Sequence, residues 1–422
     1  MLTKIDRKCY GCSMTGVRRA VIYNNEAVVV FHSPQGCGQV IREKDGKTSN
    51  HLSTVIRQDT VPIFTTNISD KDIVFGAGKK LEECLAYVIK KITPKYIVVG
   101  NSCVAGIIGD DIVSIAEAIS KEFKVPIFTV PCFGFMNGGY EEGLIGISQQ
   151  LLAYYIKPCL KKKREITLIG FVDKTNSYEF SFMEKILGEW AYNINCVFPG
   201  VATIAQIGNI ASSKACILCG NYNKVNNAYK RVAEIIGEKY EIDIINAIAP
   251  IGYKRSISWI KNVGKALMVE DSLIKLTVQK EKTEIFTMLS QYKQYFTGKE
   301  CIIYIHKIPD FIISLDWFFE LLDMTGIRVK KILFRREIKK SDIVKFIENC
   351  KMSSYVIEVG KGNKELLKEA AYVFSIRMDD IGKERLIPIP YVNPPFNTLG
   401  LEEYLKKIFK VAMKNLHRVG KI

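Results

Sequence analysis

Short runs of β-branched and aromatic residues alternate with amphipathic segments along the whole chain. Runs of this kind are typical of strands buried in a sheet, and they predict strands at 27–31, 96–99, 126–130, 166–171, 215–219, 301–305, 331–334 and 355–359. Between them, apolar positions recur with a helical period at 79–91, 111–123, 180–190, 226–239, 342–350 and 364–371. Because strands that alternate with helices form parallel sheets covered by helices, the sequence predicts an α/β protein.

Three such units follow one another along the chain. The basic run 161–164 precedes the strand at 166–171 and is expected to be a solvated linker, and a further unit begins near Lys299. The predicted units are therefore residues 1–160, 161–298 and 299–422. Each is expected to be Rossmann-like, a mostly parallel sheet flanked by helices, and each has the usual size of a domain.

Composition and charge narrow the class of protein. Hydrophobic residues are 48% and charged residues 25% of the chain, which excludes a disordered or fibrous protein. The formal net charge of +16 indicates an acidic partner or nucleic acid, unless it reflects only a Lys-, Ile- and Asn-rich composition. No nucleic-acid module and no basic stripe with interleaved aromatic residues is recognised, so nucleic acid is not the expected partner.

Two stretches bear on location. Residues 1–10 are polar and charged, without the apolar core of a secretory signal. The most apolar long stretch, 301–322, contains Pro309 and several charged residues, whereas a membrane span needs about 20 apolar residues in a row. The sequence therefore predicts a soluble, cytoplasmic protein with no membrane partner.

The chain has twelve cysteines, and a cytoplasmic protein does not use them as a disulfide framework. Five lie in apolar helical or strand patterns and are expected to be small core residues: Cys84, Cys159, Cys196, Cys301 and Cys350. Cys37, Cys103 and Cys132 each follow a predicted strand of the first unit, and Cys12 lies in a glycine-containing entry loop. Thiolates gathered at the carboxyl edge of one sheet suit an iron–sulfur cluster. A redox pair or half a zinc site formed by Cys9 and Cys12 is the alternative.

Other candidate motifs are weaker. The segment 76–79, Gly-Ala-Gly-Lys, lacks the remaining residues of a phosphate-binding loop, so the chain is not expected to bind ATP itself. Asp110 and Asp111 begin a predicted helix, where carboxylates favour a capping role over metal binding. The four histidines show no metal-ligand spacing, so a metal site must depend on cysteine.

Three strings carry a resemblance to a known family. They are the segments 31–38, 72–83 and 103–111, which begin Phe-His-Ser-Pro, Asp-Ile-Val-Phe and Cys-Val-Ala-Gly. In this order and spacing they resemble the nitrogenase component 1 superfamily, most densely over residues 9–143. That superfamily includes the subunits of the molybdenum–iron protein, its cofactor-assembly scaffold, and nitrogenase-like reductases of tetrapyrrole and sulfur metabolism.

The resemblance implies a set of metal ligands. By position, Cys12, Cys37 and Cys103 match the three cysteines that bind an iron–sulfur cluster at the interface with a sister subunit, and Cys12 fits the family spacing better than Cys9. A four-iron cluster takes four protein ligands. The sister subunit, identical or different, is therefore expected to complete the site, and Cys132 is expected beside it.

The resemblance also implies a second site. Cys219, at the end of the strand 215–219, matches the cysteine that anchors a second metallocluster in the active subunit, although a buried strand-end cysteine explains the position equally well. The family's other anchor is a histidine, and the corresponding stretch 391–397 contains none. That departure argues against a standard molybdenum cofactor and against reduction of dinitrogen.

The function implied is that of a component 1-type subunit in a nitrogenase-like iron–sulfur oxidoreductase. Electrons would arrive from an ATP-dependent iron protein and pass through the interface cluster to a substrate or a second metal cofactor. The alternative is a non-catalytic scaffold for metallocluster assembly. A cluster-free binding protein is a third interpretation, which the presence of all three cysteines disfavours. The sequence does not identify the substrate.

Overall fold

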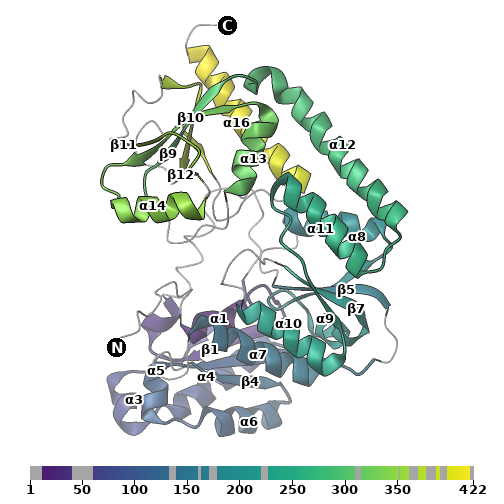
Figure 1. Cartoon of the computed structure of the whole chain (residues 1–422). Coiled ribbons are helices and arrows are strands. Elements are labelled where there is room, and N and C mark those ends of the chain that lie inside the picture. Colours follow the sequence, from purple (N-terminus) through teal and green to yellow (C-terminus); the bar gives the residue numbers. More distant parts are fainter. Residues whose placement is uncertain are drawn as a thin grey trace. The chain divides into compact units, whose positions relative to one another are not determined.

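The computed structural model describes residues 12–39, 60–132, 139–159, 163–170, 178–219, 227–308, 315–350, 352–360, 369–376, 386–389 and 397–418. They form three sheets of parallel strands with helices packed on them (Figure 1). The predicted α/β architecture, with three Rossmann-like sheets in succession, is confirmed.

The first sheet has the strand order β2-β1-β3-β4. Its strands are β1 (Ala27–His32), β2 (Ile63–Thr65), β3 (Tyr96–Asn101) and β4 (Ile127–Pro131). Both faces are covered: Val28 and Val30 share a core with α4 (Gly78–Ile92) and α6 (Ile112–Phe123). Val29 and Phe31, which point the other way, belong to the core that includes α1 (Ser13–Arg19) and α7 (Tyr140–Tyr155). Burial on both faces explains why β1 is a continuous apolar run.

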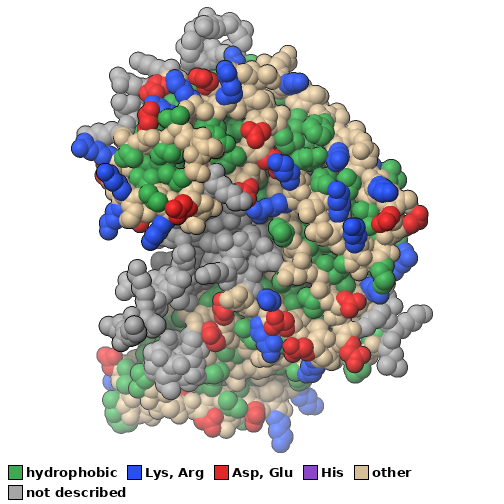
Figure 2. Space-filling view, in the orientation of Figure 1, with side chains coloured by type: hydrophobic (Ala, Val, Ile, Leu, Met, Phe, Trp, Pro, Cys, Tyr) green, Lys and Arg blue, Asp and Glu red, His purple; other side chains and the backbone are tan. Residues whose placement is uncertain are grey.

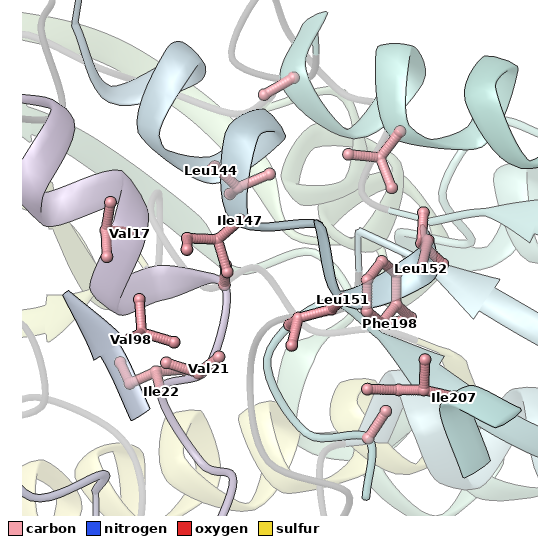
Figure 3. Close-up of a cluster of buried hydrophobic side chains, with 14 of the residues drawn as sticks. Val17, Val21, Ile22, Val98, Leu144, Ile147, Leu151, Leu152, Phe198 and Ile207 are labelled. Carbon is pink, nitrogen blue, oxygen red and sulfur yellow. The ribbon is translucent and has the colours of Figure 1, made fainter. Parts of the chain in front are cut away.

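The second sheet has the order β6-β5-β7-β8. Its strands are β5 (Lys163–Ile169), β6 (Asn193–Phe198), β7 (Ser213–Leu218) and β8 (Asp243–Asn246), and the helices beside it are α9 (Ile204–Gly208) and α10 (Asn227–Tyr240). Figure 3 shows that Leu144, Ile147 and Leu151 of α7 belong to the same buried cluster as Phe198 and Ile207. The first two sheets therefore share one core.

The start of β5 differs from the expected linker. Lys163 and Arg164 are strand residues, and the Arg164 guanidinium lies over the Tyr192 ring at 5.7 Å from its centroid. A basic side chain can occupy a strand end when its charge contacts an aromatic face, which charge counting alone does not reveal.

The third sheet has the order β11-β10-β9-β12-β13. Its strands are β9 (Glu300–Ile305), β10 (Arg328–Arg335), β11 (Ile357–Gly360), β12 (Tyr372–Ile376) and β13 (Leu386–Pro388). The helices of this part of the chain are α8 (Tyr178–Glu189), α11 (Gly252–Ala266), α12 (Asp271–Phe296), α13 (Asp316–Thr325), α14 (Lys340–Asn349) and α16 (Asn397–Arg418). The predicted helix 364–371 lies mostly outside the described residues.

The chain divides into two compact units, Met1–Ser177 with Ala191–Ala247, and Tyr178–Trp190 with Ile248–Ile422. Helix α8 thus belongs to the second unit although its neighbours in sequence belong to the first. Phe182 packs against Trp259, with ring centroids 5.5 Å apart, and Trp190 Nε1 donates a hydrogen bond of 3.1 Å to Thr277 Oγ1. The predicted domain boundaries at 160/161 and 298/299 stay predictions.

Two surface properties concern partners. Among the described helices, none is long and apolar enough to cross a membrane. On the face drawn in Figure 2, Lys and Arg side chains are interspersed with Asp and Glu, without a continuous basic stripe.

Candidate cluster site

Three thiols follow three neighbouring strands at one edge of the first sheet. Cys37 lies in the short helical segment 35–39 after β1, and its N–H donates to the carbonyl oxygen of Pro34 at 3.2 Å. Cys103 is the first residue of α5 (Cys103–Ile108), which follows β3, and Cys132 follows β4 directly. Because β1, β3 and β4 are adjacent and parallel, their carboxyl ends bring these side chains to the same rim.

Cys12 reaches the rim from a separate element. It is the N-cap residue of α1, is exposed, and forms an isolated antiparallel bridge with Gly139, which precedes α7. Helices α1 and α7 cross at two glycines. A Cβ on Gly16 would lie 1.9 Å from the carbonyl oxygen of Tyr140, and one on Gly143 would lie 2.0 Å from that of Ser13. This close crossing sets the position of Cys12.

The four thiols are close enough to influence one another. Burial raises the pKa of the Cys37 thiol, and the neighbouring Cys12 and Cys103 raise it further. Burial and the same two neighbours also raise the pKa of Cys132. Cys103 Sγ lies 3.9 Å from the carbonyl oxygen of Cys132 and donates to it. Thiols that oppose one another's ionisation are stabilised as thiolates when they bind a metal.

The donor set fits a cluster better than a single ion. Within the described ranges, no three His, Cys, Asp or Glu side chains are arranged to hold one metal ion. In an iron–sulfur cluster each cysteine binds a different iron atom, so the thiols surround the group without meeting at a point. Soft sulfur donors at a half-buried rim suit iron and sulfide. The exposure of Cys12 leaves the rim open to a ligand from another chain.

A buried polar network lies directly behind the rim. His32, the last residue of β1, is fully buried, and its Nδ1 and Nε2 lie 3.0 Å from Thr66 Oγ1 and from Asp110 Oδ2 respectively. Asp110 also accepts the Ala77 N–H, at 3.1 Å to Oδ1. Burial lowers the pKa of His32, although the Asp110 carboxylate acts in the opposite direction.

The two adjacent carboxylates have different roles. Asp111 caps α6 as expected, because its Oδ1 accepts the Ser114 N–H at 3.1 Å. Asp110, which was also expected to cap that helix, instead binds His32 and the start of α4. Sequence reasoning missed His32, although a histidine at a strand end shortly before Cys37 was a usable signal.

The second predicted site is only partly described. Cys219 is buried at the end of β7, and its Sγ donates to the carbonyl oxygen of Ile217 at 3.5 Å. Residues 220–226 and 391–396 lie outside the described residues, as does Cys9. The role of Cys219 as a cofactor anchor therefore stays a prediction.

The cysteines expected in the core divide into two groups. Cys196, Cys301 and Cys350 are buried, whereas Cys84 and Cys159 are half-buried. Burial raises the pKa of Cys84 to about 11, so that thiol is protonated at neutral pH.

A family comparison bears on this site. Residues 12–365 match the model of the nitrogenase component 1 type oxidoreductases. The chain belongs to the nitrogenase component 1 family. The match begins at Cys12 and includes Cys37, Cys103 and Cys219.

The relatives within the family have different roles. One is the nitrogenase iron-molybdenum cofactor biosynthesis protein NifE of Bradyrhizobium diazoefficiens, 24% identical over 76% of this chain and 58% of that protein. Another is the nitrogenase molybdenum-iron protein alpha chain of Clostridium pasteurianum, 24% identical over 70% of this chain and 55% of that protein. The nitrogenase molybdenum-iron protein alpha chain of Frankia alni is 32% identical over 59% of this chain and 58% of that protein. The chain thus spans less than two thirds of these relatives' length.

A solved structure shows the same component 1 fold. Nitrogenase Cp1 at pH 6.5 superposes with a TM-score of 0.61 over 96% of this chain and 89% of that one, at 16% sequence identity.

Proposed function

We propose that the chain is a component 1-type subunit of a nitrogenase-like iron–sulfur oxidoreductase whose electron donor is an ATP-dependent iron protein. The observation that carries the proposal is the convergence of Cys12, Cys37 and Cys103 at one rim of the first sheet. Family membership supports redox chemistry, because the family is one of oxidoreductases.

The role that we propose for each thiol follows from its exposure to solvent. Cys37 and Cys103 are half-buried, so they hold the group away from bulk water. Cys12 is exposed, so a sister subunit, the same chain or a different one, would supply the remaining ligand there. When bound, the cluster supplies one-electron transfer; the protein sets its burial and orientation.

Exposed apolar side chains next to the rim support contact with a protein partner. Helix α3 (Asp70–Phe75) contacts α5, and Val74 and Phe75 of α3 are 74% and 87% exposed. Ile107 of α5 is 73% exposed. Adjoining exposed apolar residues of this kind mark interaction surfaces.

A scaffold for metallocluster assembly is the second candidate. Two observations favour it: one relative is a cofactor biosynthesis protein, and the stretch 391–397 lacks a histidine to anchor a molybdenum cofactor. In either role, Cys219 is our proposed anchor for a second metallocluster. Reduction of a substrate by the chain with its partners, ATP and reductant would favour the enzyme over the scaffold.

The cluster assignment is tested by removing each ligand. We expect Cys12→Ala, Cys37→Ala and Cys103→Ala to lose most of the iron bound per chain after anaerobic purification. Cys84→Ala is the matched control, because Cys84 lies in α4 and is not part of the rim. Iron and acid-labile sulfide are measured on all four variants. Full iron in all three rim variants contradicts the assignment.

A further inference from the structure

Helix α5 begins at Cys103. The buried residue His32 contacts the chain on both sides of this helix, through its backbone carbonyl before the helix and through its side chain after it. At the start of the helix, the N–H of Ser102 donates to the carbonyl oxygen of His32 at 3.0 Å. Beyond its end, Asp110 Oδ2 lies 3.0 Å from His32 Nε2. His32 therefore contacts the chain immediately before and shortly after this six-residue helix.

The same histidine is linked by hydrogen bonds to the start of the segment that carries Cys37. Thr66, which follows β2, accepts the N–H of Ser33 at 3.2 Å through its hydroxyl oxygen, and this oxygen lies 3.0 Å from His32 Nδ1. The carbonyl oxygen of Ser33 accepts the N–H of Ile68 at 3.1 Å. The residues that lead from β1 into the Cys37 segment are thus held by hydrogen bonds to the residues after β2.

The hydrogen bonds around His32 suit a neutral imidazole, the form that its lowered pKa favours. A carboxylate only accepts, so Nε2 carries the proton that it donates to Asp110. The Thr66 hydroxyl accepts from Ser33 and donates its own hydrogen to Nδ1. In this arrangement every polar atom of the neutral imidazole has a partner, as a buried side chain requires.

We propose that the His32–Asp110 pair positions Cys103 relative to Cys37, so that the chain holds its cluster in one fixed geometry only while this pair is intact. The inference rests on the proposed function, since it concerns the same thiols. Asp110 and His32 are positioning residues: neither is a ligand, and both act through the segments that carry the ligands. Groups behind metal ligands typically change metal retention by about 10-fold to 100-fold when they are removed.

The test compares two neighbouring carboxylates in the full chain. Asp110→Asn removes the charge and leaves one acceptor oxygen for the two donors that Asp110 now binds, His32 Nε2 and the Ala77 N–H, whereas Asp111→Asn removes the same charge from the exposed cap of α6. Each protein is reconstituted anaerobically with iron and sulfide and then exposed to an iron chelator. We expect Asp110→Asn to lose iron about tenfold faster than the wild type, with a changed electron paramagnetic resonance spectrum and midpoint potential. Asp111→Asn is expected to match the wild type.

Two histidine variants separate positioning from a general loss of stability. A glutamine at position 32 can still donate to Asp110, whereas an asparagine is too short to reach it. We expect His32→Gln to keep the wild-type spectrum and rate of iron loss, and His32→Asn to behave as Asp110→Asn does. If Asp110→Asn does not fold, the comparison of His32→Gln with His32→Asn still tests whether the contact with Asp110 positions the thiols.

The outcomes distinguish this inference from the proposed function. A wild-type rate and spectrum in Asp110→Asn overturn the positioning role while the cluster assignment stands. Equal losses in Asp110→Asn and Asp111→Asn also overturn it, because charge alone would then explain the effect. A wild-type chain that takes up no iron overturns both.

Discussion

The buried imidazole of His32 makes stability depend on pH. Its folded pKa is lowered by burial, so near pH 6 the unfolded chain binds more protons than the folded chain. The contribution of the neutral ring to the free energy of unfolding is therefore fully present above the unfolded pKa of about 6.5, and it is lost as the pH falls below that value. We expect the melting temperature of the iron-free protein to fall more between pH 7 and pH 5 in the wild type than in His32→Gln. An equal fall in melting temperature in the two proteins would show that the folded state does not lower the pKa of His32.

The site residues differ in how far sequence could predict them. Cys37, Cys103 and Cys132 follow strands, and the rule that parallel strands end at one edge was enough to bring them together. Cys12 precedes the first helix and follows no strand, so the strand rule does not place it, and the family resemblance was needed to prefer it to Cys9. The contact between His32 and Asp110 joins residues 78 positions apart, and no local pattern encodes it.

The crossing of α1 and α7 makes a prediction at the level of elements. Gly143→Ala forces a methyl group against the backbone of Ser13, and relief requires the helices to separate, which costs about 1–3 kcal/mol. Gly146→Ala is the control on the same helix, because its Cβ would meet only Val130 side-chain atoms at 3.5 Å. We expect that control to be more stable than wild type by about 0.5–1 kcal/mol. Denaturant unfolding of the iron-free variants measures both changes, and equal stability would contradict the close crossing.

Two central strands of the first sheet were predicted closely. β1 and β3 are buried at every position, and the predicted strands end within two residues of the observed ones. Other strands were not predicted, among them β6, β8 and β12: β6 and β8 each begin with an exposed polar residue, Asn193 and Asp243, whereas β12 is buried throughout but directly follows the predicted helix 364–371. Helix α12, with 26 residues, was also missed, because its apolar positions follow no single helical stripe.

The whole molecule is expected to act in an assembly. Three thiols leave a cluster unfinished, and Cys12 opens to the surface. We predict that cluster-loaded protein sediments anaerobically as a dimer or as part of a larger complex with its sister subunit, and that Cys12→Ala weakens this association. A stable monomer that contains a complete cluster would contradict the prediction.

The placement of α8 in the second unit has a consequence for synthesis on the ribosome. Phe182 of α8 packs against Trp259 of α11, and Trp190, which follows α8, donates a hydrogen bond to Thr277 of α12; both partner helices are translated later. At about 5–20 residues per second, the chain needs on the order of 5–20 s to reach residue 281, where Lys185 finds its buried partner. During that interval β6, β7 and β8 of the first unit are translated, while α11 and α12, against which α8 packs, are not yet complete. We expect chaperones that bind nascent chains to occupy residues 178–190 until α12 has left the exit tunnel.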